Sequence, residues 1–163
     1  VRDLTGETAL IGVLAGTKGT VLEQIPSHQP LKFLVDPGTC FPLHTSAPGK
    51  VFLAFLPQDE AMQVISHLTL TRYTNNTITA VPALRAELQQ VRTQGFGLDM
   101  GEEIEGLNCV GAPIFNHQGY PIAAIWVTGP SFRLTQERIE GIAGVVCQNA
   151  LIISKRFGYA LLR

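Results

Sequence analysis

Residues 107–130, LNCVGAPIFNHQGYPIAAIWVTGP, form the segment around which the remaining chain is expected to fold. Two apolar runs rich in β-branched residues flank the turn sequence Asn116-His117-Gln118-Gly119, which predicts a β-hairpin. Asn at the first turn position and Gly at the fourth suit a type I turn. Because both runs are apolar on both faces, we expect the hairpin in the middle of a sheet that is covered on both sides.

The turn also predicts which side chains of the hairpin share a face. Pairing Asn116 with Gly119 places Phe115 opposite Tyr120, Gly111 opposite Ala124, Cys109 opposite Trp126 and Leu107 opposite Thr128. Since side chains alternate along a strand, these residues share one face, and the other face holds Asn108, Val110, Ala112, Ile114 and Ile125. The first face combines two small residues with a thiol, an indole and a hydroxyl, a pattern typical of a pocket floor. A glycine bulge after the turn remains an alternative, which would shift the register by one residue and turn every side chain to the opposite face.

Length and composition indicate one globular domain. The chain has 163 residues, of which 45% are hydrophobic and 15% charged, so disorder is not expected. Its net charge is −1 and it contains no run of Lys or Arg, which argues against phosphate-backbone binding by this chain itself. No apolar run reaches the roughly 18 residues of a membrane span, and no signal peptide opens the sequence.

Three widely spaced cysteines, Cys40, Cys109 and Cys147, form neither a CxxC motif nor a Cys/His cluster. They predict reduced thiols of a cytoplasmic protein rather than a disulfide framework or a zinc site. We expect neither a metal nor another cofactor. The abrupt start at Val1, without Met or a tag, indicates a fragment from which a preceding domain was removed.

The flanking sequence predicts further strands and helices, which together indicate an α+β domain with a mostly antiparallel sheet. Strands are expected at 7–15, 20–26, 31–35 and 96–99, and helices at 51–56, 58–68, 82–93 and from Thr135 to about Phe157. The last helix carries Lys155, Arg156 and Arg163 at its end, as the helix dipole favours. Residues 69–79 and the acidic stretch 101–106 are expected to be loops, with Glu102, Glu103 and Glu105 in solvent or at an interface.

The start of the helix near residue 47 is a candidate anion site. Ser46 is a suitable N-cap, and Pro48 lies near the first helical position, where its missing N–H is not needed. The unpaired backbone N–H groups of such a helix end favour a carboxylate or a phosphate, although an ordinary capped helix gives the same sequence pattern. Lys50 and Arg92 are expected to be solvated or to cap helix ends.

These motifs together resemble the C-terminal effector-binding domain of IclR-family transcriptional regulators. The matching segments are LHTSAPGKVFLAFLP, residues 43–57, and LRAELQQVRTQGFGLDMGEEIEGLNCVGAPIFNHQGYPIAAIWVTGP, residues 84–130. The resemblance covers nearly all of the chain. It implies that residues 1–163 form one effector-binding domain with a GAF- or profilin-like α+β fold and a small-molecule pocket beside the central strands.

The resemblance also implies partners. A winged helix-turn-helix domain normally precedes this domain and binds operator DNA, and it is absent from this chain. The family works as dimers or tetramers, and its members repress or activate transcription. We therefore expect no enzymatic activity and no membrane, and we expect three kinds of partner: a metabolite, further copies of the chain, and DNA only through the missing domain.

Pocket positions of the family fall on particular residues of this chain. The helix start corresponds to Ala47 and Pro48, with Gly49 next to them, and the acidic residue before the hairpin corresponds to Asp99. Asp99 could equally cap the loop at Gly101. The inward positions of the hairpin and the apolar walls correspond to Leu107, Cys109, Trp126, Thr128, Phe33 and Phe41.

Two departures from the family pattern bear on the ligand. Relatives that bind small oxo-acids hold the carboxylate with backbone N–H groups at the helix start, and Pro48 has none to give. Where such relatives carry a small hydroxyl residue, this chain has Trp126, a large apolar plate with a single N–H donor. We therefore expect an effector with an apolar or stackable face, such as a sugar acid, an aromatic acid or another, larger organic acid, rather than glyoxylate or pyruvate.

Two other functions remain open from the sequence. Cys109 could serve a catalytic or redox GAF-like domain, but a nucleophilic thiol needs a base and a lowered pKa, and no His is tied to it by a known spacing. The chain could also be a dimerisation module with a collapsed core, in which Trp126 packs as an ordinary buried residue.

Overall fold

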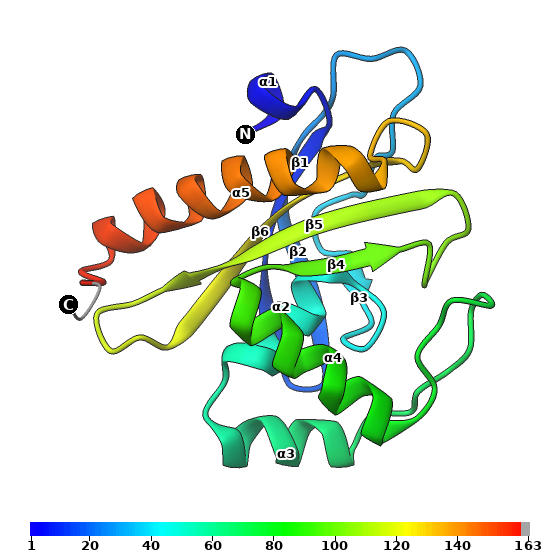
Figure 1. The fold of residues 1–163 in the computed structure, drawn as a ribbon. Coiled ribbons are helices and arrows are strands. Elements are labelled where there is room, and N and C mark those ends of the chain that lie inside the picture. Colours follow the sequence, from blue (N-terminus) through cyan, green and yellow to red (C-terminus); the bar gives the residue numbers. More distant parts are fainter. Residues whose placement is uncertain (161–163) are drawn as a thin grey trace.

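The computed structural model describes residues 1–160, which form a six-stranded antiparallel sheet between two layers of helices (Figure 1). The helix α5 crosses one face of the sheet, and α2, α3 and α4 lie on the other. The elements follow in the order α1 (Arg2–Thr5), β1 (Thr8–Ala15), β2 (Lys18–Ile25), β3 (Cys40–Phe41), α2 (Ala47–Phe55), α3 (Gln58–Ser66), α4 (Val81–Gln94), β4 (Gly97–Met100), β5 (Leu107–Phe115), β6 (Pro121–Pro130) and α5 (Gln136–Arg156). The α+β prediction is confirmed.

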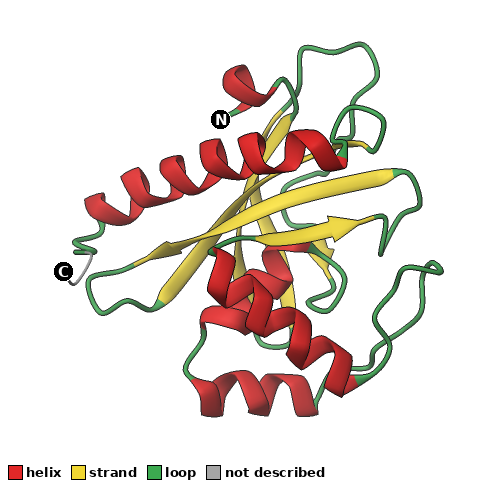
Figure 2. Cartoon of the chain, viewed as in Figure 1, coloured by secondary structure: helices red, strands yellow, loops and turns green. Residues whose placement is uncertain are grey.

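The sheet has the strand order β3-β2-β1-β6-β5-β4, so the short strands β3 and β4 form its edges (Figure 2). The hairpin of β5 and β6 lies inside the sheet, because β6 pairs with β1 and β5 pairs with β4. Eight of the nine residues of β5 are buried, as expected for a strand covered on both faces.

The facing of the predicted hairpin is confirmed, but its pairing is not. Asn116 N–H donates to Tyr120 O, and Gly119 adopts φ 74°, so the turn carries a glycine bulge that shifts the register by one residue. A second shift follows between Ile114 and Phe115. The two shifts add up to two residues, which restores the original facing. Cys109 therefore pairs with Thr128 instead of Trp126, and Gly111 pairs with Trp126 instead of Ala124.

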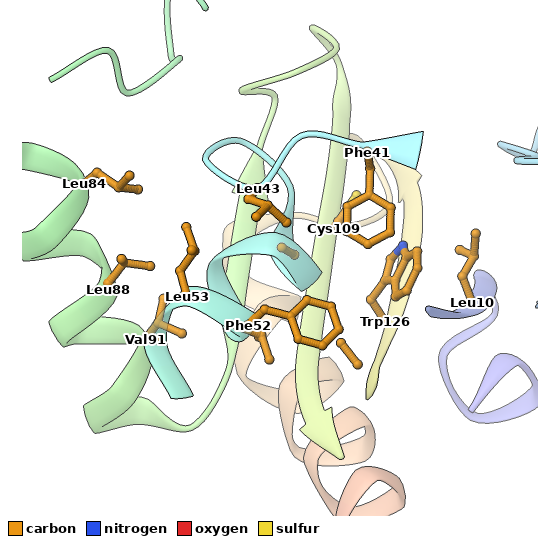
Figure 3. Packing of buried hydrophobic residues seen from close by; sticks show 14 of the residues in the cluster. Leu10, Phe41, Leu43, Phe52, Leu53, Leu84, Leu88, Val91, Cys109 and Trp126 are labelled. Carbon is orange, nitrogen blue, oxygen red and sulfur yellow. The ribbon is translucent and has the colours of Figure 1, made fainter. Parts of the chain in front are cut away.

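The two faces of the sheet pack against different helices. Val110, Ala112, Ile114 and Ile125 lie in one buried cluster with the inner stripe of α5, which comprises Ile139, Ile142 and Val146. Cys109, Ala124 and Trp126 lie in the other buried cluster, together with residues of α2 and with Leu84, Leu88 and Val91 of α4 (Figure 3). The predicted pocket residues Cys109 and Trp126 therefore project from the face of the sheet that α2 covers.

The predicted strand at 31–35 is wrong. This segment has no strand conformation, and the sheet edge beside β2 is occupied by β3, which pairs with Gly19 and Thr20. The Val35 N–H donates to the side chain of Gln24 at 3.0 Å instead of joining a strand ladder. Residues 31–35 thus run as a loop beside the sheet, with Leu31 and Leu34 exposed.

The predicted helices are confirmed to within a few residues. Thr135 precedes α5 and Lys155 and Arg156 lie in its last turn, whereas Arg163 lies outside the described residues. None of the helices within residues 1–160 has the length and apolar character that crossing a membrane requires.

Candidate functional site

A cavity of about 380 Å³ lies between the sheet, the start of α2 and two loops. Its lining comes from β4, β5 and β6, from residues 33–36 and 39–41, and from Glu103 and Ile104 of the acidic loop. Loop 33–36 is held in place at both ends, because Arg133 donates to Leu31 O at 2.8 Å and Gly38 N–H donates to Val21 O at 2.7 Å. The cavity is therefore closed on one side by an ordered loop that the sequence predicted to be a strand.

The back wall of the cavity combines a thiol, a hydroxyl and an indole, as the predicted facing requires. Cys109 and Thr128 are directly opposite each other in the sheet, and Cys109 S–H donates to Thr128 Oγ1 at 3.2 Å. Trp126 contacts Phe41 edge to face, with ring centroids 5.3 Å apart (Figure 3). The indole is 5% exposed and lines the cavity, so it forms one wall of the cavity and does not fill it.

Small residues on this face of the sheet leave room for the start of α2 and for the indole of Trp126. A Cβ at Gly111 would lie 3.3 Å from Pro48 N, and one at Gly97 would lie 2.6 Å from Ala47 O. A Cβ at Gly12 would meet the Trp126 ring at 3.0 Å. The interpretation of Gly111 as a pocket floor is therefore wrong, because the first turn of α2 covers it.

The start of α2 has few backbone donors left for an anion. Ser46 Oγ accepts from Gly49 N–H at 3.1 Å, which confirms Ser46 as the N-cap, and Pro48 has no N–H. Pro48 lines the cavity, whereas Ala47 and Gly49 do not. Gly49 serves packing instead, since a Cβ there would lie 2.5 Å from Leu43 Cα.

Asp99 on β4 both closes a loop and faces the cavity. Its Oδ1 accepts from Glu102 N–H at 2.7 Å, which is the loop-capping role considered from sequence, and its side chain also lines the cavity. Asp99 is 2% exposed, and this burial raises its pKa to about 7 against the pull of Lys50. At neutral pH the cavity therefore contains a carboxyl group that can be protonated or ionised.

Replacing Asp99 with Asn is expected to make the free energy of unfolding less dependent on pH. A carboxyl whose pKa is raised in the folded state favours folding fully below its ordinary pKa near 3.8, and this contribution is lost as the pH rises to about 7. Asn keeps an acceptor for Glu102 N–H. At about 1.4 kcal/mol per pKa unit, the variant should gain roughly 2–4 kcal/mol relative to the parent between pH 4 and pH 8. Urea unfolding across this range measures the difference. A constant difference at every pH would contradict the assignment.

Lys50 is not solvated, contrary to the prediction. Its side chain is completely buried, and Nζ donates to Glu87 Oε1 at 3.0 Å, to Leu98 O at 2.9 Å and to Glu102 Oε1. Glu102 is likewise buried rather than exposed, and burial raises its pKa although Lys50 opposes this. The Lys50 cluster, defined as Lys50, Glu87 and Glu102, joins α2 to α4 and to the acidic loop behind the cavity.

The structure brings together eight of the ten residues predicted from sequence. These cavity-lining residues are Phe33, Phe41, Pro48, Asp99, Leu107, Cys109, Trp126 and Thr128. Sequence reasoning missed the loop residues 34–36 and also Glu103, whose pKa is raised by burial. The missed loop followed two prolines and carried exposed apolar residues, a pattern that resembles an edge strand when no partner is known.

Cys109 lacks the features of a reactive thiol. Burial and the neighbouring carboxyl of Asp99 raise its pKa well above the ordinary value. Its thiol donates to the hydroxyl of Thr128, which is not a base. Among residues 1–160, no group of three or more His, Cys, Asp or Glu side chains is arranged to hold a metal ion.

Comparisons with known proteins agree with this geometry. The family described as bacterial transcriptional regulator IclR C-terminal matches residues 1–155. The HTH-type transcriptional regulator BhcR of Paracoccus denitrificans strain Pd 1222 is 35% identical over 160 residues, which cover 98% of this chain and 57% of BhcR. The HTH-type transcriptional repressor AllR of Escherichia coli strain K12 is 32% identical over 155 residues, which cover 95% of this chain and 57% of AllR.

A solved structure shows the same fold over nearly the whole chain. The crystal structure of the Thermotoga maritima IclR superimposes with a TM-score of 0.92 at 34% identity, covering 97% of this chain and 64% of the other. The chain thus spans less than two thirds of the length of these relatives. The family match and the structural superposition each cover more than nine tenths of the chain. The chain belongs to the family of C-terminal domains of IclR-type bacterial transcriptional regulators.

Proposed function

We propose that this chain is the ligand-sensing part of a cytoplasmic transcriptional regulator, and that the cavity beside Trp126 is the effector site. The observation that carries the proposal is the 380 Å³ cavity itself, which the tightly packed interior of a purely structural module would not retain. Its walls offer apolar area together with a few convergent polar groups, as small-molecule sites do. An ordered cavity at this point also argues against a dimerisation module with a collapsed core.

Effector binding would act on DNA through the arrangement of the oligomer. A preceding winged helix-turn-helix domain would contact the operator, and dimers or tetramers would hold two or more such domains in register. The effector shifts the equilibrium between arrangements only by the difference between its affinities for them. The effector would control repression or activation of transcription, and AllR is by its name a repressor.

The cavity supports binding rather than catalysis. The pKa of the Cys109 thiol is raised rather than lowered, so this sulfur is a poor nucleophile at neutral pH. Trp126 and Phe41 offer an aromatic surface, and Asp99 and Thr128 lie beside it. Such walls suit an effector with a ring or an apolar face and several hydroxyl groups, and the sugar acids, aromatic acids and larger organic acids expected from sequence share these features.

A thermal-shift screen against a metabolite library tests the proposal, because a ligand that binds only the folded state raises the Tm. Calorimetric titration of the hits should then show that ring-bearing or multi-hydroxyl compounds bind at least about tenfold more tightly than glyoxylate or pyruvate. The reverse order would contradict the effector class. A screen in which no compound raises the Tm would contradict ligand sensing at this site.

Replacing Trp126 with Ser is expected to weaken the binding of ring-bearing ligands by roughly tenfold or more, because the indole forms a wall of the cavity. Exposed Phe132, which lies outside the cavity, provides a matched control as Phe132→Ser. Calorimetric titration compares the two variants with the parent. Equal affinities for the parent and Trp126→Ser would place the ligand elsewhere.

A further inference from the structure

The part of the cavity lining that the structure describes is acidic and includes no compensating cation. Three of its lining residues carry carboxyl groups: Asp99 in the interior, Glu103 on the acidic loop, and Asp36 on the covering loop. Within residues 1–160, the lining includes no Lys, Arg or His. A charge withdrawn from water is strongly affected by neighbouring charges. The acidic walls therefore disfavour an anionic ligand relative to a neutral or cationic one.

The buried cation behind the cavity is not available to a ligand. Lys50 lies behind the cavity without lining it, and its Nζ already donates to Glu87, to Glu102 and to Leu98 O. One ammonium thus serves two carboxyl groups, and Glu102 Oε2 has no hydrogen-bond partner among the described residues. Turning Lys50 toward a ligand would leave the buried carboxyl group of Glu102 without a counter-charge.

The backbone N–H groups at the start of α2 do not replace the missing cation. Of the first α2 residues, Pro48 has no N–H, Gly49 N–H donates to Ser46 Oγ, and Lys50 N–H donates to Ser46 O. The N–H of Ala47 remains, but Ala47 does not line the cavity. A ligand carboxylate would therefore meet like charges and no donor of the α2 start.

We propose that the effector enters this cavity without a carboxylate, presents N–H or O–H donors to Asp99 and Glu103, and lays a ring or hydrocarbon face against Trp126 and Phe41. This inference rests on the proposed function and narrows its ligand class, because it removes the acidic group from the compounds expected by sequence. An ammonium group and a hydroxyl group share the required donor chemistry. An ammonium group would add an ion pair with a carboxylate and an attraction to the aromatic faces.

The pH dependence of the binding affinity distinguishes cationic, anionic and neutral ligands. Asp99 is surrounded by Glu103 and Glu102 of the acidic loop, by Lys50 of α2 and by Cys109 of β5, and its pKa is raised to about 7. An ammonium ligand favours ionised Asp99, so its affinity should rise between about pH 6 and about pH 8. A carboxylate ligand requires protonated Asp99, so its affinity should fall over the same interval. A neutral alcohol accepts either state and should depend less on pH.

The direct test is a series matched in size and ring: 4-hydroxybenzylamine, 4-hydroxybenzyl alcohol and 4-hydroxybenzoate. Calorimetric titration of the chain at constant ionic strength should give affinities in that order, with the benzoate at least about tenfold weaker than the amine. Asp99→Asn should reduce this gap roughly tenfold. Exposed Glu105 on the same loop does not line the cavity, and Glu105→Gln should leave the gap unchanged.

The outcomes separate this inference from the proposed function. A thermal-shift library with equal numbers of acids, alcohols and amines should give hits among the alcohols and amines. Hits confined to acids, or a benzoate that binds as tightly as the alcohol, would overturn the inference while leaving ligand sensing intact. A library without any hit would overturn both.

Discussion

Replacing Lys50 with Met should lower the free energy of unfolding by about 3–5 kcal/mol, the largest effect expected for any single substitution proposed for this domain. The ammonium of Lys50 is completely buried and lies within 3.0 Å of a carboxylate oxygen of Glu87. Without it, Glu102 would keep a buried carboxyl with no counter-charge, in a part of the chain where Asp99 already adds a second acidic group. Urea unfolding followed by circular dichroism at neutral pH measures the loss.

Two further variants separate charge from packing. The double variant Lys50→Met and Glu102→Gln removes the buried ammonium together with the carboxylate that depends on it, and should recover at least about 1 kcal/mol of the loss. Exposed Lys155 in the last turn of α5 serves as the control, and Lys155→Met should change the free energy of unfolding by less than about 0.5 kcal/mol. Equal losses for the single and the double variant would show that Lys50 contributes by packing alone.

The Lys50 cluster also bears on the effector site. Lys50 joins α2 to β4 through Leu98 O, one residue before Asp99, and to the acidic loop through Glu102. The same loop is fixed from the other side, since Thr77 Oγ1 donates to Glu102 O at 2.7 Å and Asn76 Nδ2 donates to Met100 O at 3.0 Å. These contacts hold Asp99 and Glu103 at the cavity. A destabilised Lys50 variant should therefore also lose ligand affinity.

Which side chains share a face of the central hairpin was predictable, because this depends only on the alternation of side chains along each strand. Two register shifts of one residue each leave Cys109, Trp126 and Thr128 on the same side, although their cross-strand partners change. The helices were predictable for a similar reason, because Leu84, Leu88 and Val91 repeat at the spacing of a helix that packs one face against a core. Local periodicity was sufficient for both.

Features that depend on distant partners were not predictable. The counter-charges of Lys50 lie 37 and 52 residues away in sequence, so nothing near Lys50 shows that its ammonium is buried. A lysine inside the apolar run APGKVFLAF was the available signal, since all residues from Ala47 to Ala54 are buried. The role of Gly111 was misjudged for the same reason. A small residue can allow a helix to pack closely or can line a pocket, and which of these occurs depends on the distant segment that packs against it.

Replacing Gly49 with Ala should lower the free energy of unfolding by about 3 kcal/mol, the upper end of the usual cost of overpacking. In an isolated helix the same change would be favourable, because Ala has a higher helix propensity than Gly. At this position an added Cβ would lie 2.5 Å from Leu43 Cα and 2.6 Å from Leu43 O. Both atoms belong to the backbone, so no side-chain rotation relieves the contact, and α2 must move away from residue 43.

The matched control for Gly49→Ala is Gly144→Ala in the middle of α5. Gly144 is exposed, and a Cβ there would have no atom within 4 Å, so the variant should gain up to about 1 kcal/mol from helix propensity alone. Opposite signs for the same chemical change in two helices would assign the loss at Gly49 to packing at the start of α2. Pro48 lines the cavity, so the displaced helix should also weaken ligand binding in the Gly49 variant and leave it unchanged in the Gly144 variant. Stabilisation by both substitutions would show that α2 does not pack against residue 43 as closely as the structure has it.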